Sequence, residues 1–148
     1  MIGLDTTTLV AYELCEVAGH EGIRATVQNL SRSGEAPFVL APQVIHEFLH
    51  VTTDPRRFEM PLTFPEALSR AKFWWNSSDV ANCYPDARSE SLALQWMGDF
   101  KLGRKRILDT ALAAAYHSFG VRRMATANPA DFAVFEVFSF EAWAVFTA

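Results

Sequence analysis

The chain has 148 residues, of which 50% are hydrophobic and 20% are charged, and its formal net charge is −4. This length and composition predict a single globular domain over residues 1–148 and exclude a disordered chain. The mild acidity argues against a protein that coats nucleic acid through bulk positive charge. Two isolated cysteines, no signal-peptide pattern and no apolar run of membrane-span length lead us to expect a reducing, cytoplasmic location and no membrane contact.

Short apolar runs alternate with longer helical patterns along the chain. In chain order, we expect a strand at 2–4, helices at 6–13 and 20–33, a strand at 38–41, helices at 42–51 and 65–76, a strand at 80–84, helices at 87–100 and 109–118, a strand at 123–126, a short turn or helix at 128–132, and a strand at 136–138. Strands that alternate with helices predict an α/β fold, in which helices cover both faces of a parallel sheet. The aromatic C-terminal segment, which includes Trp143 and Phe146, is expected to pack on the sheet or on a partner.

Acidic residues follow several of these predicted elements. Asp5 comes directly after the first strand, and Asp131 lies one turn beyond the fourth strand, which Thr126 ends. In parallel α/β sheets the site lies at the carboxyl ends of the strands, so these carboxylates fall where chemistry is expected. Asp5, and also Asp109 at the start of an Ala-rich helix, could instead serve as helix N-caps. Glu47 lies in a mostly apolar helix, either at its solvent edge or turned into a polar pocket.

Carboxylates that converge at one edge of a sheet repel one another, and a bound cation compensates this repulsion. Hard oxygen ligands favour Mg²⁺ or Mn²⁺ over zinc. Such a metal activates water and stabilises charge on a phosphate, which suits hydrolysis of phosphodiesters.

Four blocks of the sequence resemble PIN-domain ribonucleases in order and spacing, over nearly the whole chain. They read LDTTTLV at 4–10, VIHEF at 44–48, LDTALAAA at 108–115 and TANPADF at 126–132. The most similar subgroup is the VapC-like toxins of bacterial toxin–antitoxin pairs, which the segment TDPRRF at 53–58 also resembles. The resemblance implies a three-layer α/β/α sandwich with a parallel sheet of about five strands in the order 3-2-1-4-5. It also implies a Mg²⁺- or Mn²⁺-dependent endoribonuclease that acts on RNA, pairs with a small antitoxin protein and forms a homodimer.

The same resemblance assigns roles to individual residues. Asp5, Glu47 and Asp109 would be the catalytic carboxylates and core metal ligands, and Asp131 a fourth, often acting through water. Thr6 and Thr126 would orient ligands or phosphate. The chain departs from the family at two positions: Thr7 stands where Asn is usual, and Asn128 stands where some members have Asp. Asp131 and Asn128 therefore both remain candidates for the fourth contact.

A basic run, Arg104, Lys105 and Arg106, immediately precedes Asp109. Short charge runs are commonly solvated. The functional alternative is that these three residues contact RNA phosphates and position the substrate around the metal.

Two other functions share parts of this pattern. His46 and His50 flank Glu47 as HEFLH, which matches the HExxH pattern of zinc peptidases, although Glu66 and His117 are the only loose candidates for a third ligand. A PIN fold without activity, acting as an RNA-binding or interaction module, is the other alternative. A haloacid-dehalogenase-type phosphatase would need a second Asp where Thr7 stands, and no Gly-rich phosphate loop is present.

Overall fold

The computed structural model describes residues 1–34 and 37–141, and the aromatic segment beyond residue 141 lies outside them. Its centre is a five-stranded sheet in the order β3-β2-β1-β4-β5, and every neighbouring pair is parallel. The strands are β1 (Ile2–Leu4), β2 (Phe38–Leu40), β3 (Val80–Asn82), β4 (Arg123–Ala125) and β5 (Ser139–Glu141). The fold class and strand order expected from the sequence are confirmed.

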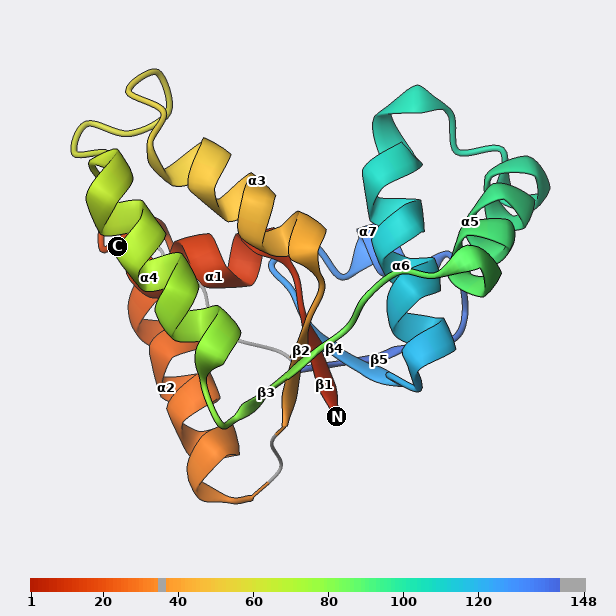
Figure 1. The fold of residues 1–148 in the computed structure, drawn as a ribbon, viewed down its shortest axis with the longest axis horizontal. Coiled ribbons are helices and arrows are strands. Elements are labelled where there is room, and N and C mark those ends of the chain that lie inside the picture. The colour runs from red at the N-terminus through yellow and green to blue at the C-terminus, as the bar shows by residue number, and fades with distance from the viewer. Residues whose placement is uncertain (35–36, 142–148) are drawn as a thin grey trace.

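Helices cover both faces of this sheet (Figure 1). One face carries α1 (Thr6–Glu13), α2 (His20–Arg32), α3 (Pro42–Thr52) and α4 (Phe64–Asn76), and the other carries α5 (Ala87–Phe100), α6 (Ile107–Phe119) and α7 (Ala130–Ala133). A 3₁₀ turn, η1 (Arg104–Arg106), precedes α6. The three-layer arrangement follows from right-handed crossovers, which place successive helices on one face until the strand order reverses at β1.

Helix α6 packs closely against the centre of the sheet. Its residues Ala113, Ala114 and Ala115 are buried, so small side chains allow the close approach. At Gly3 of β1, a Cβ would lie only 2.7 Å from Cδ2 of the Tyr116 ring, which explains the glycine there. The buried Tyr116 hydroxyl lies 2.6 Å from the carbonyl oxygen of Leu4 and 3.0 Å from that of Val39. Helix α6 is thereby tied to the carboxyl ends of β1 and β2.

The expected fifth strand at 136–138 is wrong by three residues. Glu136 has a φ of 56°, in the left-handed region that non-glycine residues rarely adopt, so the chain turns there and β5 begins at Ser139. Helix α6 begins at Ile107, two residues before Asp109, so Asp109 lies in its first turn and does not cap it. Among the described residues, no helix is long and apolar enough to cross a membrane.

Candidate metal centre

Asp5 is the first residue after β1 and the N-cap of α1, so its expected role as a cap is confirmed. Its Oδ1 accepts hydrogen bonds from the backbone N–H of Thr8 at 3.1 Å and from the hydroxyl of Thr7 at 2.7 Å. Its Oδ2 accepts from the hydroxyl of Thr126 at 2.6 Å. Asp5 is only 5% exposed, and this burial raises its pKa although the surrounding donors lower it.

The same hydroxyls bind the loop that follows β4. The Thr126 hydroxyl accepts from the backbone N–H of Asn128 at 3.0 Å, and the Thr7 hydroxyl accepts from that of Ala127 at 3.1 Å. Each threonine therefore donates to the Asp5 carboxylate and accepts from the loop. Asp5 is held rigidly between the ends of β1 and β4, with both oxygens fixed in direction.

Three carboxylates from separate parts of the chain line one small cavity. It has a volume of about 40 Å³ and is lined by Asp5, Thr6, Thr7, Gln43, Glu47, Leu108, Asp109 and Leu112. Gln43, one turn before Glu47 on α3, donates to the backbone carbonyl of Leu108 at 3.1 Å, which holds α3 against the start of α6. Glu47 itself is exposed, at the solvent side of its helix. A cavity of this size has room for a small ion or a few water molecules, since about 10–15 Å³ of such volume is enough for one water.

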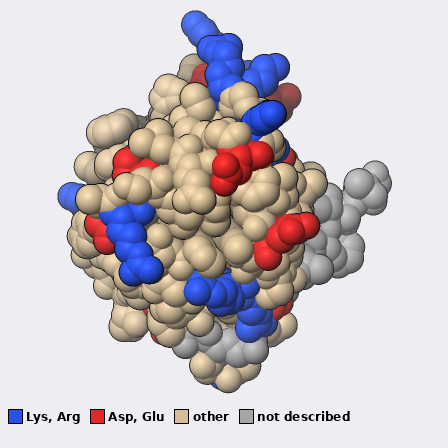
Figure 2. Space-filling view, turned by 90° about the vertical axis from the view of Figure 1, so that its right-hand side faces the viewer, with Lys and Arg blue, Asp and Glu red and all other residues tan. Residues whose placement is uncertain are grey.

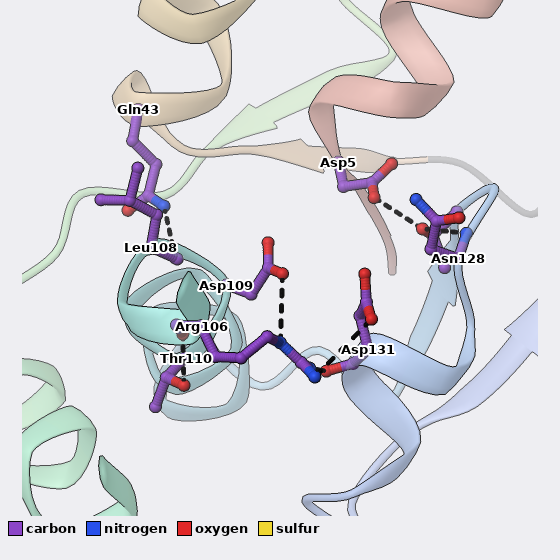
Figure 3. A network of polar contacts seen from close by, with 9 residues as sticks. Asp5, Gln43, Arg106, Leu108, Asp109, Thr110, Asn128 and Asp131 are labelled. Atoms are coloured by element: carbon purple, nitrogen blue, oxygen red, sulfur yellow. Dashed lines mark hydrogen bonds and ion pairs between the residues drawn. The ribbon is translucent and has the colours of Figure 1, made fainter. Parts of the chain in front are cut away.

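Arg106 neutralises part of the acidic charge (Figure 3). Its Nε lies 3.5 Å from Oδ2 of Asp109, and one terminal nitrogen lies 3.6 Å from Oδ1 of Asp131. The other terminal nitrogen donates to the backbone carbonyl of Asp131. The pKa of Asp109 is raised by burial, then by the negative charges of Asp131 and Asp5, while Arg106 lowers it. Arg106 thus bridges Asp109 and Asp131 at the edge of the cavity.

Asp131 does not line the cavity itself, and Asn128 is exposed. As the side chains stand, no group of three or more His, Cys, Asp or Glu within residues 1–34 and 37–141 is close enough to hold a metal ion. Arg106 pairs with Asp109 and Asp131 at the edge of the cavity, and Glu47 is exposed on α3 although it lines the cavity. The donor set fits a hard divalent cation in chemistry, because it offers carboxylate oxygens around a cavity of ion-sized volume.

The basic run before α6 divides into two kinds of side chain. Arg104 and Lys105 are exposed on η1, whereas Arg106 turns inward to the carboxylates. Figure 2 shows blue side chains at the top of the face formed by α5 and α6, where Figure 1 places the connection between these helices. Arg106 thus pairs with acidic side chains. The sequence alone had instead suggested the same role, contact with RNA, for Arg104, Lys105 and Arg106.

The histidines of the HExxH pattern lie outside the carboxylate cavity. His46 and His50 are exposed on α3. The loose third ligands are engaged elsewhere: Glu66 accepts from the hydroxyl of Thr63 at 3.0 Å, and the His117 ring lies 5.6 Å from that of Trp96. These contacts give no support to a zinc site on α3.

Sequence reasoning missed the hydrogen-bonding roles of Thr7, Thr8 and Gln43. A run of three threonines directly after Asp5 was the available signal, because N-terminal hydroxyls readily bond to nearby backbone and carboxylate groups. Gln43 had no such signal, since its partner Leu108 is remote in the sequence.

Similarity to known proteins was found at the level of structure. No protein-family model matches the sequence, and no curated protein matches it significantly. The crystal structure of VapC20 from Mycobacterium tuberculosis, described as a sarcin–ricin loop cleaving toxin, matches with a TM-score of 0.64 and 18% identity. The match covers 84% of this chain and 87% of that chain. The chain has the fold of a VapC toxin. In this VapC fold, the acidic cavity lies at the carboxyl ends of the strands, where α/β proteins place their sites.

Proposed function

We propose that the protein is a Mg²⁺- or Mn²⁺-dependent endoribonuclease and the toxin of a type II toxin–antitoxin pair. One observation carries the proposal: Asp5, Glu47 and Asp109, from three distant segments, line one cavity in a chain with the fold of an RNA-cleaving toxin. Burial raises the pKa of Asp5 and Asp109, and the negative charges of Asp131 and Asp5 raise that of Asp109 further. Such crowding of carboxylates is costly without a function, and a divalent cation offsets that cost.

Asp5, Glu47 and Asp109 would hold the metal, with Asp131 as the fourth acidic residue. When bound, the metal would polarise the phosphate and lower the pKa of an attacking water. Thr7 and Thr126 fix both Asp5 oxygens, so this carboxylate needs no reorganisation to bind a cation.

The positive side chains beside the site would orient RNA. Arg104 and Lys105 are exposed where a phosphate backbone would pass, and Arg106 supplies a cation between Asp109 and Asp131. Phosphate contacts of this kind position the substrate and carry no sequence information.

Protein partners are proposed on the evidence of exposed apolar side chains. Met60, Phe64 and Phe73, on α4 and the loop before it, are 79%, 60% and 72% exposed. Exposed apolar groups mark an interaction surface where they form a contiguous patch. We propose that the protein acts in the cytoplasm as a homodimer that a small antitoxin inhibits; light scattering of the purified protein tests the dimer.

Cleavage of RNA by matched glutamate variants tests the function. Glu47→Gln removes a carboxylate charge from the cavity, whereas Glu90→Gln makes the same change on the exposed side of α5. We expect Glu47→Gln to reduce Mn²⁺-dependent cleavage about a hundredfold and Glu90→Gln to leave it unchanged. Equal activity of both variants would refute the assignment of Glu47. Wild-type protein that binds RNA but cleaves none in Mg²⁺ or Mn²⁺ would establish the inactive RNA-binding alternative.

Metal analysis distinguishes the zinc-peptidase alternative. We expect the purified protein to hold no stoichiometric zinc, because His46 and His50 lie outside the cavity and their loose third ligands are engaged elsewhere. Stoichiometric zinc that is lost in His46→Ala would contradict the ribonuclease proposal.

A further inference from the structure

A second, larger cavity adjoins the acidic one. Its volume is about 290 Å³, near the lower end of the range of about 300–1,000 Å³ typical of small-molecule sites. Thr6, Thr7 and Glu47 line both cavities, so the two share a wall. A ligand whose charged part reaches the carboxylate cavity would therefore extend its next group into the larger one.

The walls of this larger cavity are mostly apolar. They include Ala18, Val51 and Phe58, while Glu47 and Arg57 are among the few polar groups. An apolar cavity with a few polar groups and one aromatic ring suits a planar heterocycle, which stacks on the ring and hydrogen bonds at its edges.

The wall that carries Phe58 is held in place by two carboxylates. Asp54 accepts from the backbone N–H of Arg56 at 2.9 Å, and its own carbonyl accepts from those of Arg57 and Phe58. Glu16 accepts from the backbone N–H groups of Glu59 and Met60, both at 3.0 Å. The segment 54–60 is therefore fastened to the connection between α1 and α2, directly beside Val17. The cavity is preformed, which lowers the entropic cost of binding.

The charged side chains at the mouth of the larger cavity complement the chemical groups of a nucleotide. Arg57 lies 3.4 Å from Asp54, and its side chain remains 58% exposed, so it can contact a phosphate beside the cavity. Glu47 lines both cavities and has two carboxylate oxygens, so one oxygen can bind the metal while the other accepts a hydrogen bond from a base N–H group. A cation and an acceptor on the rim of an apolar cavity complement the phosphate and the base of one nucleotide.

We propose that this cavity binds the nucleobase adjacent to the scissile phosphate of RNA, with Phe58 as its stacking platform and Arg57 as a phosphate contact. The proposal rests on the ribonuclease function proposed above and adds the element that gives this enzyme a base preference. It also gives a role to the segment 53–58, which the metal site does not use.

Binding of labelled octaribonucleotides tests the proposal without cleavage. The host is Asp109→Asn, which keeps the substrate intact, and the probes are single-base octamers of each of the four bases and an octamer of abasic ribose phosphates. We expect at least one base-containing octamer to bind about tenfold more tightly than the abasic octamer, since stacking on an aromatic side chain contributes about that much. Ala18→Trp fills the cavity from its exposed rim, and we expect it to reduce this difference to about threefold or less.

Ala87→Trp is the matched control, because Ala87 is exposed at the start of α5 and lines neither cavity. It should leave the tenfold difference unchanged. Equal affinities for base-containing and abasic octamers, or an unchanged difference in Ala18→Trp, would overturn the proposal and leave the cavity to a protein partner. Failure of the ribonuclease function would be seen in a separate experiment. The wild-type protein would then cleave no RNA in Mn²⁺, whatever the affinities of the octamers.

Discussion

The hydroxyl of Thr126 is the contact whose loss should be most informative about the site. Thr126→Val keeps the shape of the side chain but removes the donor to Oδ2 of Asp5 and the acceptor for the N–H of Asn128. Thr126 is 3% exposed and Asp5 5%, so water cannot replace these bonds. A hydrogen bond to a charged group contributes about 1.5–3 kcal/mol and a neutral one about 0.5–1.5 kcal/mol. The free energy of unfolding should therefore fall by about 2–4 kcal/mol.

Urea unfolding of the metal-free protein measures this change in the free energy of unfolding. With a slope of about 2 kcal/mol per molar urea, the midpoint should fall by about 1–2 M. The deficit should be smaller at pH 5 than at pH 8, because without this donor the pKa of Asp5 rises further and the carboxyl is protonated more readily. Thr126→Ser keeps the hydroxyl and is the control. A loss below about 0.5 kcal/mol in Thr126→Val would refute the view that Thr126 stabilises the charged form of Asp5.

Two further predictions concern the charge of the site and the packing beneath it. Burial raises the pKa of Asp5 and Asp109 above the ordinary 3.8, so the native state binds protons more tightly than the unfolded state. The melting temperature of the metal-free protein, compared with that of the double variant Asp5→Asn/Asp109→Asn, should therefore fall as the pH rises above about 4. Saturating Mn²⁺ should remove this fall. A melting temperature that rises equally with pH in both proteins would contradict it. Gly3→Ala places a Cβ 2.7 Å from the Tyr116 ring and should lower the free energy of unfolding by about 1–3 kcal/mol, whereas Gly98→Ala, with nothing within 4 Å, should not lower it. If chemical denaturation showed equal changes in the free energy of unfolding for Gly3→Ala and Gly98→Ala, close packing of α6 on β1 at Gly3 would be refuted.

The parts of the fold that follow local rules were predictable from the sequence. The parallel sheet and the place of Asp5 at its edge follow from alternating strands and helices, because the carboxyl ends of parallel strands form one edge. The strand order was expected from the resemblance to PIN domains. The boundary of β5 was not predictable, since a left-handed turn at Glu136 has no glycine or asparagine to mark it.

The arrangement of the site was only partly predictable for a similar reason. The spacing of Arg106 and Asp109, three residues apart, is one that allows ion pairs on helices, but three consecutive basic residues suggested solvent exposure for all of them. All three residues lie in the 3₁₀ turn before α6, yet Arg106 turns inward while Arg104 and Lys105 remain exposed. The link from Arg106 to Asp131 joins segments 25 residues apart, and tertiary packing alone creates it.

Cleavage of total RNA by the wild-type protein and by the double variant Asp5→Asn/Asp109→Asn is the most direct test of the central claim. Both changes remove a carboxylate charge that faces the 40 Å³ cavity and preserve side-chain shape. With the wild-type protein we expect discrete cleavage products in Mn²⁺ and none in EDTA. The double variant should produce none in either, while its circular dichroism remains that of a folded protein. Cleavage that persists in the double variant at the wild-type rate would show that these carboxylates do not form the catalytic metal centre.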